Sequence, residues 1–321
     1  MINLRYHIVS LTAVFLALAI GVAMGTGFLN KATVEQLRRQ INKAEGGIDK
    51  ANDENAQLRE DLERAAQTDQ ALLASGELLV SGRLSDVPVL VVASENIDQG
   101  SLTKLRTLLA QSGADLRGTL TISDRLRLDA GDDDQLAEIL NTPAKNRPVL
   151  QIGLTTAFAG ALRESADRPP ESEATSSPLV ADLVEAKYLG YQTPDDAPEG
   201  LDASTMLAGG GFRYVFVSGP DPRTPDVDFL LPVLRSMAAD GPAPVVVASA
   251  AVGDEAEQTR TASVGAIRND TSLRDELSTV DDLERLSGLL ATLLALDDLD
   301  AGIRGHYGLG AGRQSELPGS T

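Results

Sequence analysis

An uncharged segment near the N-terminus constrains this chain more than any other feature of its sequence. From Ile8 to Leu29 it runs for 22 residues without an acidic or basic side chain, IVSLTAVFLALAIGVAMGTGFL. As a helix it would be about 33 Å long, enough to cross the roughly 30 Å hydrocarbon core of a bilayer. We therefore predict a transmembrane helix at residues 8–29, preceded by a short cytoplasmic N-terminus at residues 1–7.

A cleaved signal peptide is the alternative, with cleavage after Gly21-Val22-Ala23. The apolar region of a signal peptide usually spans only about 7–15 residues, so the length favours an uncleaved anchor. Arg5 precedes the segment, while Lys31, Arg38 and Arg39 follow it, so the charge bias gives little guidance on orientation. Because large domains translocate largely regardless of charge, we expect the acidic remainder to lie outside the cytoplasm.

Small residues recur at every fourth position of this segment, at Ala13, Ala17, Gly21 and Gly25. They would share one helix face and allow two membrane helices to approach closely. Small residues are also common in membrane helices generally, so the pattern indicates a transmembrane interface only in combination with the segment that follows.

A heptad pattern follows the anchor. Core-type positions are separated by alternating steps of three and four from residue 34 to residue 72, which is typical of a coiled coil. The residues that define the predicted interface are Val34, Leu37, Ile41, Ile48, Asn55, Leu58, Leu62 and Leu72. Branched side chains at a, leucine at d and a single Asn at a favour a parallel dimer. We therefore predict a homodimeric coiled coil at residues 30–75, with the transmembrane helices pairing in the same sense.

Two features weaken this coil. Three of its core positions are alanine, and Gly46-Gly47 costs roughly 1 kcal/mol per glycine in a helix. The alternative is a helix that packs on its own globular domain, although such a stripe is usually wider and less regular.

The rest of the chain predicts an α/β globular domain at residues 76–301, with an open, mainly parallel sheet of four or five strands. Uniformly apolar runs at 87–94, 213–219 and 243–249 indicate strands buried on both faces, and 114–123 completes a βαβ unit. We expect an edge strand at 263–267 and one helix at 278–296, capped by Ser278 or Thr279. The glycine-rich residues 302–321, which include His306, predict a flexible tail with an exposed histidine.

Composition excludes several function classes. The 28 basic and 47 acidic residues give a net charge of −19, which argues against binding nucleic acid. The chain has no cysteine and two histidines, so a thiolate metal site or a Ser-His-Asp triad is not expected. We therefore predict a protein that is not an enzyme and carries no cofactor.

Polar residues follow three predicted strands, at Ser94, Glu95, Ser218, Asp221 and Ser249. The carboxyl ends of parallel strands are the usual place for ligands, so these residues are a candidate ligand or partner surface. They are equally compatible with N-caps of the following helices, and such caps are commoner than ligand sites. An enzyme built on them is the weakest of the functional hypotheses.

The N-terminal block NLRYHIVSLTAVFLALAIGVAMGTGFL resembles the signature of the actinobacterial MctB family, known as copper transporters. The blocks LVSGRLSDVPVLVVAS, RYVFVSGP, STVDDL and GHYGLG resemble that family in the same order. The resemblance implies two functions. One is a SteB-like cell-envelope adaptor that pairs with a SteA-like cytoplasmic partner and controls a peptidoglycan hydrolase during cell separation. The other is copper transport or homeostasis, as a channel or efflux protein, with copper as the only metal implied.

The residues themselves favour the adaptor as the main expectation and copper transport as the alternative. Copper(I) selects thiolate and thioether ligands and copper(II) selects imidazole, whereas this chain has four methionines and two histidines. We expect a single-pass plasma-membrane protein with its C-terminal domain outside the cytoplasm. The outer mycolate membrane is the alternative location.

Overall fold

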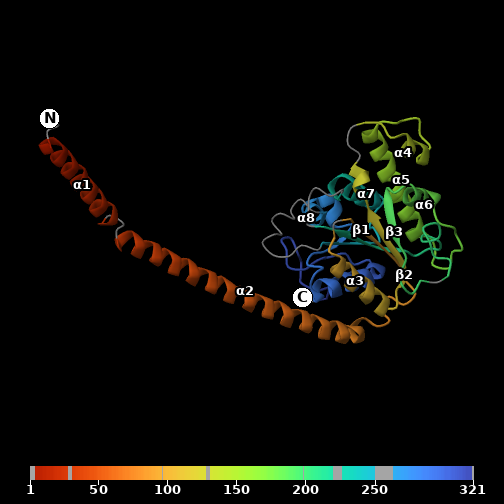
Figure 1. Cartoon of the computed structure of the whole chain (residues 1–321). Coiled ribbons are helices and arrows are strands. Elements are labelled where there is room, and N and C mark those ends of the chain that lie inside the picture. The colour runs from red at the N-terminus through yellow and green to blue at the C-terminus, as the bar shows by residue number, and fades with distance from the viewer. Residues whose placement is uncertain are drawn as a thin grey trace. The chain divides into compact units, whose positions relative to one another are not determined.

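The computed structural model describes residues 4–27, 31–95, 97–127, 131–197, 199–219, 226–249 and 263–319. The chain divides into two compact units, Met1–Thr68 and Asp69–Thr321 (Figure 1). The first consists of helices, and the second contains all the strands that the structure describes.

Two long helices account for the first unit. Helix α1 (Leu4–Gly27) contains the predicted anchor, and α2 (Lys31–Val80) is a single helix of 50 residues that continues into the second unit. Among the described residues, one helix is long and apolar enough to cross a bilayer, at Arg5–Gly25, with a mean hydropathy of 2.4. Its side chains are exposed along its whole described length, as expected for a helix that faces lipid.

A seven-stranded sheet organises the second unit. Its strands lie in the order β3-β2-β1-β4-β5-β6-β7, and all neighbours are parallel except β2 and β3. The strands are β1 (Pro88–Ser94), β2 (Asp115–Ile122), β3 (Leu189–Gln192), β4 (Arg213–Ser218), β5 (Val245–Ser249), β6 (Ser278–Val280) and β7 (His306–Tyr307). The predicted mainly parallel α/β fold is confirmed.

Helices cover both faces of the sheet (Figure 1). One face packs against α4 (Asp134–Ile139), α5 (Arg147–Asp167), α6 (Pro178–Glu185), α7 (Leu231–Ala238), α8 (Ser263–Asn269) and α9 (Thr271–Arg274). The other packs against α3 (Gln99–Gln111), α10 (Leu286–Asp298) and the end of α2. Every residue of β1, β4 and β5 is buried, which explains why these strands read as continuous apolar runs. Short helical turns complete the unit: η1 (Asp124–Arg127), η2 (Asp226–Leu230) and η4 (Leu299–Ala301).

Two predicted elements near the C-terminus are wrong. Residues 263–267, expected as an edge strand, begin helix α8. Residues 278–296, expected as one helix, divide into strand β6 and helix α10, whose N-cap position is Arg285 rather than Ser278 or Thr279. Ser278–Val280 forms a strand because its backbone pairs with the free edge of β5. The left-handed backbone of Asp282 (φ +73°) then redirects the chain, and α10 begins at Leu286.

The predicted flexible tail is also wrong for its central residues. His306 and Tyr307 form β7, which pairs with β6, and His306 is only 2% exposed rather than a surface histidine. Strand β3 was not predicted from the sequence either. Helix α6 ends at Glu185, and Lys187 (φ +61°) reverses the chain into this antiparallel edge strand.

Candidate functional site

Three of the predicted strand-end residues lie side by side. Strands β1, β4 and β5 end at Ser94, Ser218 and Ser249, and the register pairs Ser218 with Ser249 and Ala93 with Val217. All three serines are at most 2% exposed. The order of strands reverses between β1 and β4, which is the point where sheets of this kind usually bind ligands. We call this set the serine row.

The other two predicted residues do not join the serine row. Glu95 is exposed, and its Oε2 atom accepts a hydrogen bond of 3.3 Å from the backbone N–H of Asp124, which ties β1 to η1. Asp221 lies outside the described residues. The alternative that Ser94 caps the next helix is wrong, because Asp98 is the N-cap of α3 and accepts a hydrogen bond of 2.7 Å from Ser101 N.

Asp282 is a polar residue next to the serine row that sequence analysis missed. It follows β6 and is 1% exposed, and the N–H of its neighbour Leu283 donates to Ser249 O at 3.0 Å. Neither carboxylate oxygen of Asp282 accepts a hydrogen bond from a described residue, and the Nε atom of Arg285 lies 3.5 Å from Oδ1. Burial raises the pKa of Asp282 to about 7, partly offset by Arg285. This carboxyl group can therefore exchange a proton near neutral pH.

Its neighbour Asp281 holds the C-terminal segment in place. The Asp281 carboxylate accepts hydrogen bonds from Gly310 N at 3.0 Å and from the buried guanidinium of Arg268. Arg268 also donates to Tyr307 O at 2.6 Å. A Cβ atom on Gly308 (φ +113°) would lie 2.2 Å from Asp281 Oδ1, so this position requires glycine. The STVDDL block, which contains Asp281, therefore packs directly against the GHYGLG block, which contains Gly308 and Gly310.

The described methionine and histidine side chains, which are the residue types here that copper prefers, do not form a cluster. Met206 and Met237 are buried in the core, at 0% and 1% exposure, whereas His7 and Met24 are exposed on α1. Both ring nitrogens of His306 have partners: Nδ1 lies 2.8 Å from Thr279 Oγ1, and Nε2 lies 3.0 Å from a backbone carbonyl oxygen.

The pKa of His306 agrees with this structural role. Burial, reinforced by the charge of Arg268, lowers the pKa to about 4, so the ring is neutral at physiological pH. In the part of the chain that the structure describes, no group of three or more His, Asp or Glu residues could hold a metal ion.

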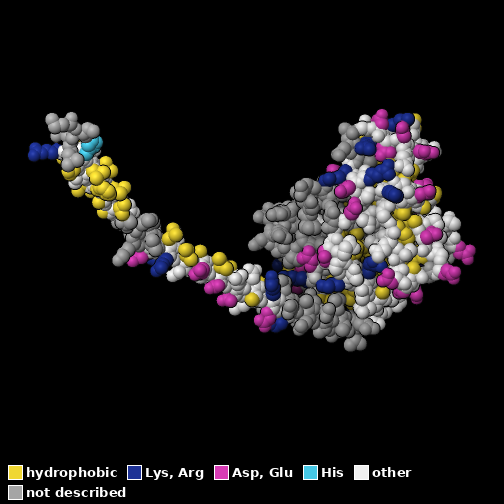
Figure 2. Space-filling view, in the orientation of Figure 1, with side chains coloured by type: hydrophobic (Ala, Val, Ile, Leu, Met, Phe, Trp, Pro, Cys, Tyr) yellow, Lys and Arg dark blue, Asp and Glu magenta, His cyan; other side chains and the backbone are white. Residues whose placement is uncertain are grey.

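The predicted interface residues of the first unit are exposed where they are described. On α1, Ala13, Ala17, Gly21 and Gly25 all face outward, and a Cβ atom on either glycine would meet nothing within 4 Å. On α2, large apolar side chains of the heptad pattern are 48–60% exposed, namely Leu37, Ile41, Ile48 and Leu58. Figure 2 shows hydrophobic side chains along both helices.

The remaining coiled-coil positions add little. Asn55 donates from Nδ2 to Ala51 O at 2.8 Å within its own helix. The side chains of Val34, Leu62 and Leu72 lie outside the described residues. The pairing of α2 with a second copy therefore stays a prediction.

Comparison with known proteins identifies similar sequences over nearly the whole chain. The family model described as "Copper transport outer membrane protein, MctB" matches residues 1–318. Proteins named "Copper transporter MctB" from Mycobacterium tuberculosis and Mycobacterium bovis are each 29% identical to this chain over 98% of both sequences. The protein of the same name from Mycobacterium leprae is 27% identical over 98% of both sequences.

Proposed function

Because this chain belongs to the MctB family, we propose that it is a single-pass membrane protein that serves copper transport at the cell envelope. The observation that carries the proposal is the exposed apolar helix α1, which matches the bilayer in length and is part of a family match that names copper transport. Copper enters this proposal from the names of the relatives, because the described residues include no group of three or more His, Asp or Glu side chains that could hold a metal ion.

In this proposal the chain acts through protein contacts rather than as a ligand of the copper ion. Two observations support this role: Met206 and Met237 are buried in the core, and both ring nitrogens of His306 already have hydrogen-bond partners. The exposed heptad pattern of α2 supports a parallel homodimer in which the stalk presents two α/β domains. We place the anchor in the plasma membrane with these domains outside the cytoplasm, and the outer membrane is the alternative.

A deletion strain tests the copper function. We expect higher cellular copper and poorer growth in copper medium after deletion, both restored by the wild-type chain. The variant Val14→Arg with Leu18→Arg places two charges in the membrane segment and should not restore them. The matched variant Gln40→Arg with Asn42→Arg adds the same charge to α2, outside both the membrane and the heptad positions, and should restore them. Unchanged copper and growth after deletion would contradict the proposal.

A second candidate function is the SteB-like adaptor, in which the chain recruits a SteA-like partner and controls a peptidoglycan hydrolase without being an enzyme itself. The exposed apolar positions of α2 favour it, because adaptors need an unoccupied dimerisation or docking helix. Time-lapse microscopy of the deletion strain in copper-free medium separates the two functions. Chains of unseparated cells are expected for the adaptor, and normal division for a function confined to copper.

A further inference from the structure

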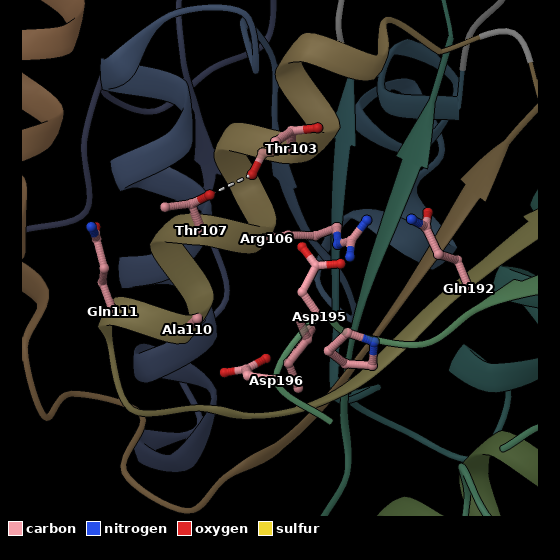
Figure 3. A pocket seen from close by; sticks show the side chains of 10 residues that line it. Thr103, Arg106, Thr107, Ala110, Gln111, Gln192, Asp195 and Asp196 are labelled. Carbon is pink, nitrogen blue, oxygen red and sulfur yellow. Dashed lines mark hydrogen bonds between the residues drawn. The ribbon is translucent and has the colours of Figure 1, made fainter. Parts of the chain in front are cut away.

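A polar pocket lies on the side of the α/β domain where α3 meets the end of β3. It has a volume of about 440 Å³, within the range of small-molecule sites. Helix α3 supplies one wall, and the turn after β3 supplies the other (Figure 3). Leu116 and Pro194, both buried, provide its apolar surface.

The pocket carries opposite charges on its two walls. Arg106 extends from α3, and Asp195 and Asp196 extend from the turn after β3. Figure 3 shows Arg106 and Asp195 pointing toward one another, with Asp196 further along the same turn. None of the three side chains makes an ion pair or a side-chain hydrogen bond with another described residue. Charges of both signs are therefore available to one bound molecule.

One lining residue of this pocket has a buried polar atom without a described hydrogen-bond partner, and a second such atom belongs to a neighbouring strand residue. The Oε1 atom of Gln111, which lines the pocket, is buried and accepts no hydrogen bond from a described residue. Thr119 is not a lining residue; it is 0% exposed, and its Oγ1 atom also has no hydrogen-bond partner among the described residues. Thr119 pairs in register with the lining residue Gln192 and, like Val91 beside it, faces α3. Buried polar atoms of this kind usually bind water or a ligand.

We propose that this pocket binds a small zwitterion, either a free amino acid or a short peptide with both ends free. Arg106 would receive the carboxylate, since a guanidinium matches its planar geometry, and Asp195 and Asp196 would receive the ammonium group. A dicarboxylate would be repelled by the two aspartates and a diamine by Arg106. The amides of Gln111 and Gln192 suit the peptide group between the two ends.

Calorimetric titration of the full-length chain in detergent with L-alanyl-L-alanine tests this site. We expect binding at roughly millimolar concentration, and affinity about tenfold lower for the N-acetylated dipeptide and for the dipeptide amide, each of which lacks one charge. Free L-alanine should bind as well if the two charged ends suffice. Absence of heat with the dipeptide, or equal affinity for the capped forms, would overturn the proposal.

Two variants assign the charges. Arg106→Gln should weaken the dipeptide about tenfold and leave the dipeptide amide unchanged, because the amide has no carboxylate to lose. Asp195→Asn with Asp196→Asn should give the opposite pattern, with the N-acetylated dipeptide unchanged. Lys104→Gln is the matched control, since it removes one positive charge from α3 outside the pocket. If Lys104→Gln and Arg106→Gln change the affinity equally, the proposed site is wrong.

Discussion

Asp282 combines three properties that rarely occur together in one residue. It is buried, its carboxylate oxygens have no hydrogen-bond partner in the part of the chain that the structure describes, and its backbone is left-handed at φ +73°. Each of these costs stability, and a position that carries all three is a candidate for function. It lies beside the serine row, at the carboxyl edge of the sheet. The only sequence signal for this position is the acidic pair Asp281-Asp282 that directly follows residues 278–280.

Asp282 should make the stability of the domain depend on pH. Its pKa of about 7 in the folded chain lies above the ordinary 3.8, so the unfolded chain loses this proton first as the pH rises. Burial of the Asp282 carboxyl group therefore destabilises the folded chain in a pH-dependent way. This destabilisation is absent at low pH, grows as the pH rises from about 4 to about 7, and is complete above that range. Asp282→Asn should therefore raise the free energy of unfolding by about 2 kcal/mol near pH 8 and by little near pH 4.

Urea unfolding of the full-length chain at both pH values measures this difference. Asp86→Asn is the matched control, because Asp86 has a similar backbone (φ +62°) but an exposed carboxylate. If Asp282→Asn raises the free energy of unfolding equally at the two pH values, or if Asp86→Asn raises it by the same amount, then backbone strain and not the buried charge is responsible.

Gly308 fixes the C-terminal segment around Asp281. Alanine at this position would place a Cβ atom 2.2 Å from the Asp281 carboxylate, in addition to the left-handed backbone. We expect Gly308→Ala to lower the free energy of unfolding by more than about 2 kcal/mol. Gly241→Ala carries a similar backbone strain (φ +105°) with nothing within 4 Å, so it should cost only about 1 kcal/mol. Equal losses in thermal unfolding would show that the contact with Asp281 adds nothing.

At the scale of single elements, α2 carries apolar heptad positions that remain exposed where the structure describes them. Its heptad positions Leu37, Ile41, Ile48 and Leu58 are about half exposed, and apolar side chains of this size usually pack against a partner. Since the chain has no cysteine, one introduced cysteine reports pairing without interference. Leu58→Cys should form a disulfide between two chains on mild oxidation, because equal d positions meet in a parallel coil.

Controls separate a specific coil from chance collision. Ala56→Cys, two residues away on the outer face of the predicted coil, should cross-link much less. Adding Ile41→Asp and Ile48→Asp to Leu58→Cys should abolish the cross-link, because buried like charges would face each other. Equal cross-linking at positions 56 and 58, measured by non-reducing electrophoresis, would contradict the predicted register.

At the scale of the whole molecule, the second unit should be stable without the first, because it contains its own hydrophobic core. Both hydrophobic clusters of the second unit are formed by residues from Val80 onward. We therefore expect a fragment of residues 69–321 to fold and to unfold at the same temperature as the domain in the full-length chain. It should sediment as a monomer, since it lacks the anchor and most of the heptad pattern. A dimeric fragment would move the interface to the α/β domain.

The sequence by itself determined the elements that depend on local pattern. The uncharged run at residues 8–29 is long and apolar enough for a membrane-spanning helix, and the apolar runs 87–94, 213–219 and 243–249 are typical of strands covered on both faces. These features predicted the membrane helix, the parallel sheet and the serines at its carboxyl edge, because a strand's direction and its last residue are readable from the chain.

Only the tertiary structure decided the C-terminal third. Residues 278–280 have a short pattern compatible with helix or strand, and the open edge of β5 selected the strand. Residues 305–310 look like a flexible glycine-rich tail, yet Arg268 and Asp281 bind their backbone groups, and the glycines allow that close approach. The same holds for the pocket between α3 and β3, whose opposite charges lie about ninety residues apart in sequence. Contacts between distant segments carry no local signal, so their consequences emerge only when the sheet brings them together.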